Sequence, residues 1–319
     1  MIRAMAEHRI VSLIASATEI VTSLGFEDQL VGRSHECDFP PSVERLPVCS
    51  EARIDVDGSS REIDDRVKSA LTDATSIYRV FEDVLHELQP TIIITQAQCE
   101  VCAVSLKDVE RAVCNLVDSK PRVVSLEPMR LADVWKDIIT VGEALGARKR
   151  AEEFVKAQMS CMQAISGAIE KQLGSPESSR PTIACIEWID PLMAAGNWVP
   201  ELVEIAGGTD VLGRAGRHSG YLTFEQLAQA DPDVIAVSAC GWGIARTRAE
   251  MAPLAKHPGW ASLKAVRTDR VYLTDGNWYF NRPGPRLVES AQILGEILHP
   301  QVFAPSFEGR GWVRFDPAD

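Results

Sequence analysis

The sequence predicts an α/β protein with two Rossmann-like lobes, each built on a parallel sheet, joined by one long rigid helix. Two observations favour this fold class: a pattern of helix, glycine and strand occurs twice, and so does a pattern of helix, proline and apolar strand. The length of 319 residues adds a third, because a single hydrophobic core rarely extends over so long a chain. Two domains are therefore expected.

The first duplicated pattern is an amphipathic helix that ends at a glycine and is followed by a short strand. Its copies run from Glu19 to Arg33 and from Glu201 to Arg214. The second pattern is a helix stopped by a proline before an uninterrupted apolar strand, with copies from Phe81 to Ile94 and from Phe224 to Val237. Strands that are apolar on both faces are typical of buried parallel sheets. Chance similarity between βα units is the alternative, and two matches in the same order disfavour it.

The first lobe is expected over residues 1–147, from a strand at Arg9 to Leu13 to a strand at Arg122 to Leu126. Two helix starts carry the spacing of a capping box, in which a side-chain oxygen and an acidic or amide side chain satisfy free backbone amides. These boxes are Ser16 with Glu19 in the first lobe and Thr223 with Gln226 in the second.

The rest of the chain divides into an insertion, a connecting helix, a second lobe and a tail. Residues 51–80 interrupt the first lobe with a segment rich in Asp, Ser and Arg, expected at the surface near the ligand and without assignable chemistry. Helical periodicity over 148–174 predicts the connecting helix. The second lobe is expected over 175–300, and residues 301–319 are expected to form an irregular tail.

Charge and hydropathy exclude several classes of function. The net charge of −12 disfavours nonspecific binding to nucleic acid or to an anionic membrane. No segment approaches the roughly 18 to 20 consecutive apolar residues that span a bilayer, so membrane insertion is not expected. The phosphate-loop, nucleophile-elbow and H-E-x-x-H motifs are absent, which leaves those three chemistries without support.

The N-terminal residues predict a cytoplasmic location. The first apolar run spans only Ile10 to Ala15, which fits a buried strand better than a secretory signal. Three of the eight cysteines, Cys114, Cys161 and Cys185, lie in strongly patterned elements, where a reduced thiol packs as a small apolar group.

A series of short motifs runs through both lobes in a specific order. The first lobe has Val31-Gly32-Arg33, Asp38-Phe39-Pro40-Pro41 and Leu88-Gln89-Pro90. The second lobe has Ile189-Asp190-Pro191-Leu192, Gly196 to Gly208, Asp231-Pro232-Asp233 and Trp278 to Arg286. This order, from about residue 9 to residue 298, resembles the class III substrate-binding proteins of the iron-chelate and cobalamin type, and is most similar to the cobalamin-binding member.

The resemblance implies two lobes joined by the helix Arg148 to Leu173, little hinge motion, and a ligand in the cleft between the lobes. It also implies docking on a membrane permease through an acidic residue on each lobe. Glu82 or Asp83 fits that role in the first lobe. The matching loop of the second lobe, Asn197 to Pro200, has an aromatic residue there and reaches its first carboxylate only at Glu201. Partnership with an ABC permease is therefore expected to be altered or absent.

Loops that follow strands hold the candidate binding residues, because ligands of parallel α/β sheets lie beyond the carboxyl ends of the strands. In the first lobe these candidates are His35, Glu36, Cys37, Gln96, Cys99 and Cys102. Imidazole and thiolate are ligands that zinc, iron and cobalt prefer, so His35 and the three cysteines are candidate metal ligands. A redox pair of Cys99 and Cys102, or a structural role in the core, is the alternative.

The strand-end loops of the second lobe are rich in aromatic residues. The candidates there are Trp188, Asp190, Asn197, Trp198, His218, Trp242, Trp278, Tyr279, Asn281 and Arg282. Large flat rings suit a large flat ligand, and Asn281 and Arg282 suit its peripheral amides or carboxylates. His218 is a candidate axial ligand to cobalt or iron, or else a solvated loop histidine. Alternatively, Trp278 packs with Phe280 under the C-terminal helix.

These observations predict a protein that binds cobalamin, another corrinoid or a related metal chelate and acts in intracellular storage, delivery or sensing. No catalytic residue is assigned. One rival is a metal-binding or thiol-dependent enzyme on the same fold, with Cys37, Cys99 and Cys102 as zinc or iron ligands or as reactive thiols. A second rival is the substrate-binding component of an ABC transporter.

Overall fold

The structure is a computed structural model that describes residues 8–72, 77–96, 120–173 and 180–316. The chain divides into two compact units. The first comprises residues 1–58, 62–128 and 132–157; the second comprises Ser59–Arg61, Met129–Leu131 and Gln158–Asp319. Each unit contains a sheet whose central strands are parallel, together with helices, so the predicted two-lobed α/β architecture is confirmed.

The sheet of the first unit is four-stranded and parallel, in the order β2-β1-β5-β6. Its strands are β1 (Ile10–Ser12), β2 (Leu30–Arg33), β5 (Ile92–Gln96) and β6 (Arg122–Leu126). Among the described residues, the helices α1 (Ala15–Ser23), α3 (Glu82–Leu88) and α5 (Leu131–Ala144) accompany them. Every residue of β5 is buried, as the apolar run Ile92 to Ile94 predicts for a strand inside a parallel sheet.

The two predicted capping boxes have different outcomes. Thr223 and Gln226 form the box at the start of α8 (Phe224–Ala230), where each side chain bonds the backbone of the other residue. The box at Ser16 and Glu19 is wrong, because α1 begins one residue earlier and its N-cap is Ile14. Ser16 and Glu19 are both buried inside the first unit, so packing places them within the helix rather than at its end.

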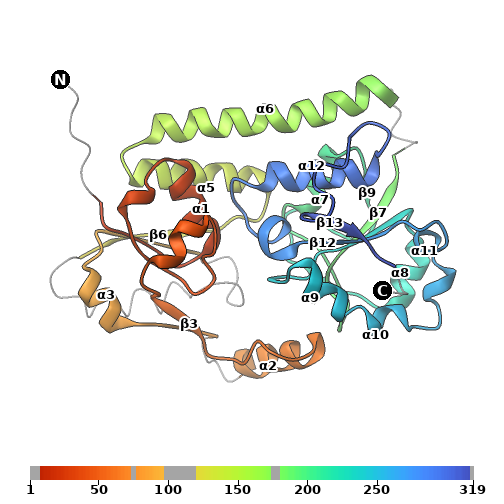
Figure 1. The fold of residues 1–319 in the computed structure, drawn as a ribbon, viewed down its shortest axis with the longest axis horizontal. Helices are drawn as coiled ribbons and strands as arrows, with labels where there is room; N and C mark the ends of the chain where they lie inside the picture. The colour runs from red at the N-terminus through yellow and green to blue at the C-terminus, as the bar shows by residue number, and fades with distance from the viewer. Residues whose placement is uncertain (1–7, 73–76, 97–119, 174–179, 317–319) are drawn as a thin grey trace. The chain divides into compact units, whose positions relative to one another are not determined.

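The insertion forms a strand pair with a helix between its two strands. β3 (Ser50–Ala52) and β4 (Tyr78–Val80) pair antiparallel, and α2 (Ser60–Thr72) lies between them in the sequence. Val67 and Ala70 on α2 pack against the buried cluster that includes Tyr78 and Val80. The insertion therefore has a small apolar core with the first unit; α2 and β3 are orange in Figure 1.

The sheet of the second unit has the order β10-β8-β7-β11-β12-β13, with β9 also paired to β7. β7 (Thr182–Trp188), β11 (Val234–Val237) and β12 (Val271–Thr274) are parallel neighbours. The remaining strands are short: β8 (Met193–Ala194), β9 (Thr209–Asp210), β10 (Gly220–Tyr221) and β13 (Trp312–Arg314).

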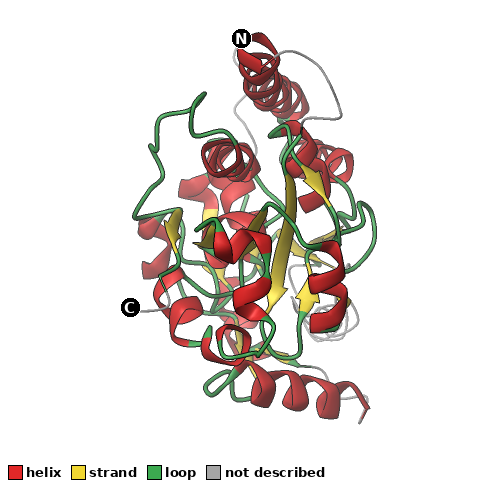
Figure 2. Cartoon of the chain, turned by 90° about the vertical axis from the view of Figure 1, so that its right-hand side faces the viewer, coloured by secondary structure: helices red, strands yellow, loops and turns green. Residues whose placement is uncertain are grey.

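Helices cover this sheet, and Figure 2 shows yellow strands with red helices beside them. Besides α8, they are α7 (Val199–Ile205), α9 (Ile244–Ala249), α10 (Ala252–Ala255), α11 (Lys264–Arg267) and α12 (Leu287–Leu298). Side chains from β7, β11 and β12 form the core with apolar residues of α8, α10 and α11. Short 3-10 turns lie at Glu27–Gln29, Pro41–Arg45 and Trp260–Ser262, and a π-turn, η5, spans Gly276–Phe280.

The connecting helix is present as α6 (Arg148–Leu173), a continuous helix of 26 residues that is yellow-green in Figure 1. Its residues up to Ala157 belong to the first unit and those from Gln158 to the second. Among the described residues, no helix combines the length and the apolar character that crossing a membrane requires.

The tail after residue 300 is part of the sheet, not an irregular appendage. β13 pairs antiparallel with β12, and Phe315 donates its backbone amide to the carbonyl oxygen of Val271. The buried carboxylate of Glu296 on α12 holds this segment, because it accepts four hydrogen bonds from Ser306, Phe307 and Trp312. The prediction missed this strand because its pairing depends on residues far away in the sequence.

The three cysteines expected in the core differ from one another. Cys185 is buried in β7, and burial raises the pKa of its thiol well above the usual value. Cys161 is exposed on α6, so its expected burial is wrong. Cys114 lies outside the described residues.

Candidate functional site

The loop after β2 places His35 and Glu36 against the base of the insertion. The His35 Nδ1 atom lies 3.1 Å from the Ser50 hydroxyl, and its ring centroid lies 5.5 Å from that of Tyr78. The Tyr78 hydroxyl donates to a carboxylate oxygen of Glu36 at 3.4 Å. Burial lowers the pKa of His35, and the nearby Glu51 partly opposes that effect. His35 is therefore a neutral, hydrogen-bonded histidine at pH 7.

Cys37 lies in an environment that suits a protonated thiol. Its side chain is 1% exposed, and its sulfur is 3.0 Å from the Thr18 hydroxyl and 3.2 Å from the Ser34 hydroxyl. Burial raises the pKa of Cys37, although both hydroxyls favour the thiolate. A reactive cysteine needs the opposite, an accessible thiol with a lowered pKa.

The predicted metal cluster of the first unit is only partly described. Gln96 is the buried last residue of β5, while Cys99 and Cys102 lie outside the described residues. Over the part of the chain that the structure describes, no group of three or more His, Cys, Asp or Glu side chains is arranged to hold a metal ion. The cluster of His35 with the three cysteines stays a prediction.

Tryptophan side chains meet where neighbouring strands of the second unit end. Trp188 ends β7 and Trp242 follows β11, and because these strands are parallel neighbours their carboxyl ends lie side by side. The two ring centroids are 4.7 Å apart, and the guanidinium of Arg246 lies 4.6 Å from the centroid of Trp242. We call Trp188 and Trp242 the tryptophan pair. The loops 188–190, 238–243 and 275–282 form the carboxyl edge of this unit.

The loop after β12 holds Trp278 on a well-bonded turn. Asp275 accepts the backbone amide of Trp278 at 2.7 Å at the start of η5, and π-turns of this kind occur often at functional sites. Burial raises the pKa of Asp275, and the Trp278 amide and the positive charge of Arg282 oppose that effect. Trp278 is 38% exposed, and the Arg286 guanidinium lies 5.5 Å from its ring centroid. The Trp278 side chain is therefore partly exposed at the carboxyl edge.

The other residues predicted on this loop support it instead. The Asn281 side-chain amide donates to the carbonyl oxygens of Ser238 and Gly276, and Arg282 donates to Asn277 at 2.7 Å. Tyr279 and Phe280 are buried, so the alternative of packing applies to them and not to Trp278.

Two of the three remaining candidates, Trp198 and Asn197, serve the fold, and the third, His218, is exposed. Trp198 is 4% exposed and donates its indole N–H to the carbonyl oxygen of Phe280. Asn197 has a φ of +50° and its backbone bonds Arg217 and Gly216. His218, in contrast, is exposed on the loop before β10. The structure thus brings Trp188 together with Trp242, which is 8% exposed, and keeps Trp198 apart from them in the core.

Sequence reasoning missed Arg246 and Arg286, which stack on tryptophans of the carboxyl edge. Arg246 was detectable, because it follows Trp242 by four residues where a helix begins, and side chains at that spacing share a helix face. Arg286 approaches Trp278 through the fold of the loop that follows η5, for which the sequence offers no local signal.

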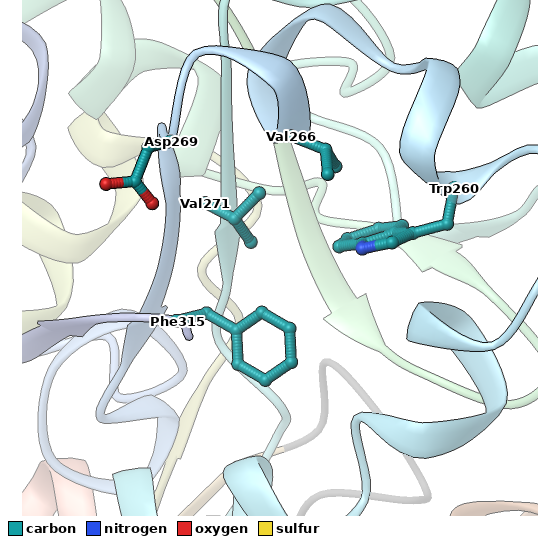
Figure 3. Close-up of a pocket in the computed structure, with 5 residues that line it drawn as sticks. All are labelled: Trp260, Val266, Asp269, Val271 and Phe315. Atoms are coloured by element: carbon teal, nitrogen blue, oxygen red, sulfur yellow. The ribbon is translucent and has the colours of Figure 1, made fainter. Parts of the chain in front are cut away.

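A small cavity lies at the opposite end of β12 from the carboxyl edge. Figure 3 shows its lining residues, Trp260, Val266, Asp269, Val271 and Phe315, and its volume is about 40 Å³. Val271 is the first residue of β12, whereas Asp275 follows the last. The cavity has room for a few water molecules and is separate from the tryptophan pair.

Comparisons with known proteins agree with this fold. Residues 10–277 match the family described as Periplasmic binding protein. A curated relative from Bacillus subtilis, "Uncharacterized ABC transporter substrate-binding lipoprotein YvrC", is 24% identical over 298 residues, covering 92% of this chain and 81% of its own.

Solved structures show the same fold at low identity. The apo form of the periplasmic heme-binding protein RhuT from Roseiflexus sp. RS-1 has a TM-score of 0.67 and 22% identity, covering 93% of this chain and 100% of its own. The periplasmic vitamin B12 binding protein BtuF of Vibrio cholerae has a TM-score of 0.57 and 19% identity, covering 91% and 96%.

Proposed function

Because this chain belongs to the periplasmic binding protein family, we propose that it captures a metal chelate with a large flat ring, a corrinoid such as cobalamin or a haem. The observation that carries this proposal is the tryptophan pair with Arg246 at the carboxyl edge of the second unit. The family consists of binding proteins, which agrees with the absence of an assigned catalytic residue.

The chemistry of this edge suits a ring system larger than a free ion. A tryptophan buries about 150–250 Å² on contact and loses little conformational entropy, so indole faces bind flat ligands well. The partly exposed Trp278 adds a third indole at the end of the neighbouring strand β12. Arg246 and Arg286 add positive charge beside these rings, which suits the carboxylate or amide groups at the rim of a tetrapyrrole.

The expected cytoplasmic location is wrong. The matched family is described as periplasmic, and the Bacillus relative is a substrate-binding lipoprotein of an ABC transporter. We propose that this chain likewise works outside the cytoplasm and passes its ligand to an ABC permease. This replaces the expectation of altered or absent permease partnership and the role in intracellular storage or sensing.

The alternative of a thiol-dependent enzyme receives no support from Cys37, which is the one cysteine of its three that the structure describes. Cys37 is buried and burial raises the pKa of its thiol, so Cys37 is a poor nucleophile at neutral pH.

Titration of the purified protein with cyanocobalamin and with hemin, followed by calorimetry and visible absorption, tests the proposal. We expect one of the two to bind with a Kd near micromolar or below, about −8 kcal/mol. Trp188→Leu and Trp278→Ala should each weaken binding about tenfold, because each removes an indole face. Trp260→Phe, at the far end of β12, should leave the affinity unchanged. Equal affinity in all four proteins, or no binding of either compound, would contradict the proposal.

A further inference from the structure

The tripeptide Ser59–Arg61 belongs to the second unit, where it contacts the carboxyl edge. Ser60 is completely buried. Its backbone amide and its hydroxyl both donate to one carboxylate oxygen of Glu250, at 3.0 Å and 3.3 Å. Glu250 is the C-cap of α9, the helix that carries Arg246.

The same tripeptide engages two residues of the carboxyl edge. The indole N–H of Trp188 donates to the carbonyl oxygen of Ser60 at 3.1 Å. Arg61 forms an ion pair with the carboxylate of Asp190. The polar groups of Trp188 and Asp190 are therefore already bonded within the protein, although both residues stand at a strand end where a ligand is expected.

We propose that Ser59–Arg61 is a releasable latch, which holds Trp188 and Asp190 in the ligand-free protein and leaves them when a chelate binds. This inference rests on the proposed function of the tryptophan pair. A carbonyl or carboxylate at the rim of the chelate replaces the Ser60 carbonyl as acceptor for the Trp188 indole. Asp190 then becomes available to donor groups of the ligand.

The latch combines a weak, exposed ion pair with stronger, buried hydrogen bonds, so it can hold in the absence of ligand and still release. The Arg61 and Asp190 side chains are 50% and 32% exposed, and ion pairs in contact with solvent contribute little to stability. The Ser60 bonds are buried and go to a charged acceptor, so they keep the latch closed in the absence of ligand. When a binding-competent state is only partly populated, the apparent affinity falls by the fraction of molecules in that state.

Two variants weaken the latch from different sides. Arg61→Ala removes the ion pair with Asp190, and Glu250→Gln weakens both bonds to Ser60 while preserving side-chain shape. Each should tighten the binding of cyanocobalamin or hemin by about threefold to tenfold, mainly through faster association, because more molecules start open. Arg314→Ala is the control: it breaks an ion pair with Asp269, whose side chains are 57% and 67% exposed and which lies outside the carboxyl edge. Its affinity should stay within about twofold of the wild type.

Hydrogen exchange of the peptide around residues 59–63 tests the latch without depending on ligand affinity. In the ligand-free protein this peptide should be protected, and it should exchange at least about tenfold faster in both latch variants. Saturation with the bound probe should speed its exchange in the wild type.

Slower exchange on binding, or unchanged or weaker affinity in both variants, would overturn the latch and make the tripeptide a fixed part of the edge. If neither probe binds any of the proteins, the proposed function fails. The ligand-free exchange rates then decide the latch alone: faster exchange in both variants supports it, and equal rates overturn it.

Discussion

Replacing Glu296 by Gln is expected to destabilise the second unit by about 4 kcal/mol. One carboxylate oxygen of Glu296 accepts the amide and hydroxyl of Ser306, at 3.1 Å and 2.5 Å. The other accepts the amide of Phe307 at 3.0 Å and the indole N–H of Trp312 at 2.8 Å. A glutamine keeps one neutral oxygen as acceptor for the buried donors of Phe307 and Trp312, and its NH₂ group then faces the exposed Ser306. Replacing the charged acceptor by a neutral one costs about 1–1.5 kcal/mol for each of the two buried bonds, and the loss of the two Ser306 bonds costs about 0.5–1 kcal/mol each, which gives about 3–5 kcal/mol in total.

The measurement is thermal unfolding followed by circular dichroism and tryptophan fluorescence. For a unit of this size, about 4 kcal/mol corresponds to a fall in Tm of roughly 8–16 °C. Glu153→Gln on α6 is the control, because its exposed ion pair with Lys149 spans 3.8 Å and should matter by less than about 0.5 kcal/mol. A loss below about 1 kcal/mol in Glu296→Gln would refute the reasoning, since it would mean that the bonds to residues 306–312 are dispensable.

Three further predictions concern single side chains. Trp260→Phe should leave the free energy of unfolding unchanged or raise it slightly. The buried Trp260 indole N–H has no hydrogen-bond partner among the described residues, so its removal relieves that cost. A loss above about 2 kcal/mol in urea unfolding would contradict this. Burial raises the pKa of Asp210 to about 6, above its unfolded value near 3.8, so the protonated form favours folding and this contribution is lost as pH rises from about 4 to 6. Asp210→Asn should therefore raise the free energy of unfolding at pH 8, by up to about 3 kcal/mol, but not at pH 4; an equal effect at both values would show that Asp210 titrates normally. Finally, iodoacetamide should alkylate the exposed Cys161 in the folded protein while Cys37 and Cys185 react only after unfolding, as peptide mass mapping would show; early labelling of Cys37 would contradict its burial.

The sequence predicts those parts of the fold that depend on local chemistry. The box at Thr223 and Gln226 is correct because both partners lie within one helical turn. The buried strands predicted at Ile92 to Ile94 and Val234 to Val237 are correct because apolar residues on both faces fit only the interior of a sheet. Ser16 illustrates the limit: its spacing from Glu19 is right for a cap, but burial of the first turn of α1 decides where the helix begins.

The candidate site shows the same division. Trp188 and Trp242 could be placed at strand ends from the sequence, and the parallel pairing of β7 and β11 then brings their rings together. Trp198 also follows a strand, yet its indole N–H bonds the carbonyl oxygen of Phe280, a partner that no local pattern indicates. The contacts of Ser60 and Arg61 with the carboxyl edge were equally hidden, because they join residues more than a hundred positions apart.

The pairing of β13 with β12 has a consequence for the folding of the newly synthesised chain. On the ribosome, β12 emerges before α12 and the segment that carries β13, so for a time one side of β12 has no partner. Unpaired strand edges attract other chains, and nascent chains expose such edges until the missing strand arrives. The Glu296 carboxylate then accepts hydrogen bonds from Ser306, Phe307 and Trp312 and so holds the segment that carries β13. Because β12 ends at the carboxyl edge, the docking of β13 completes the sheet beside that edge.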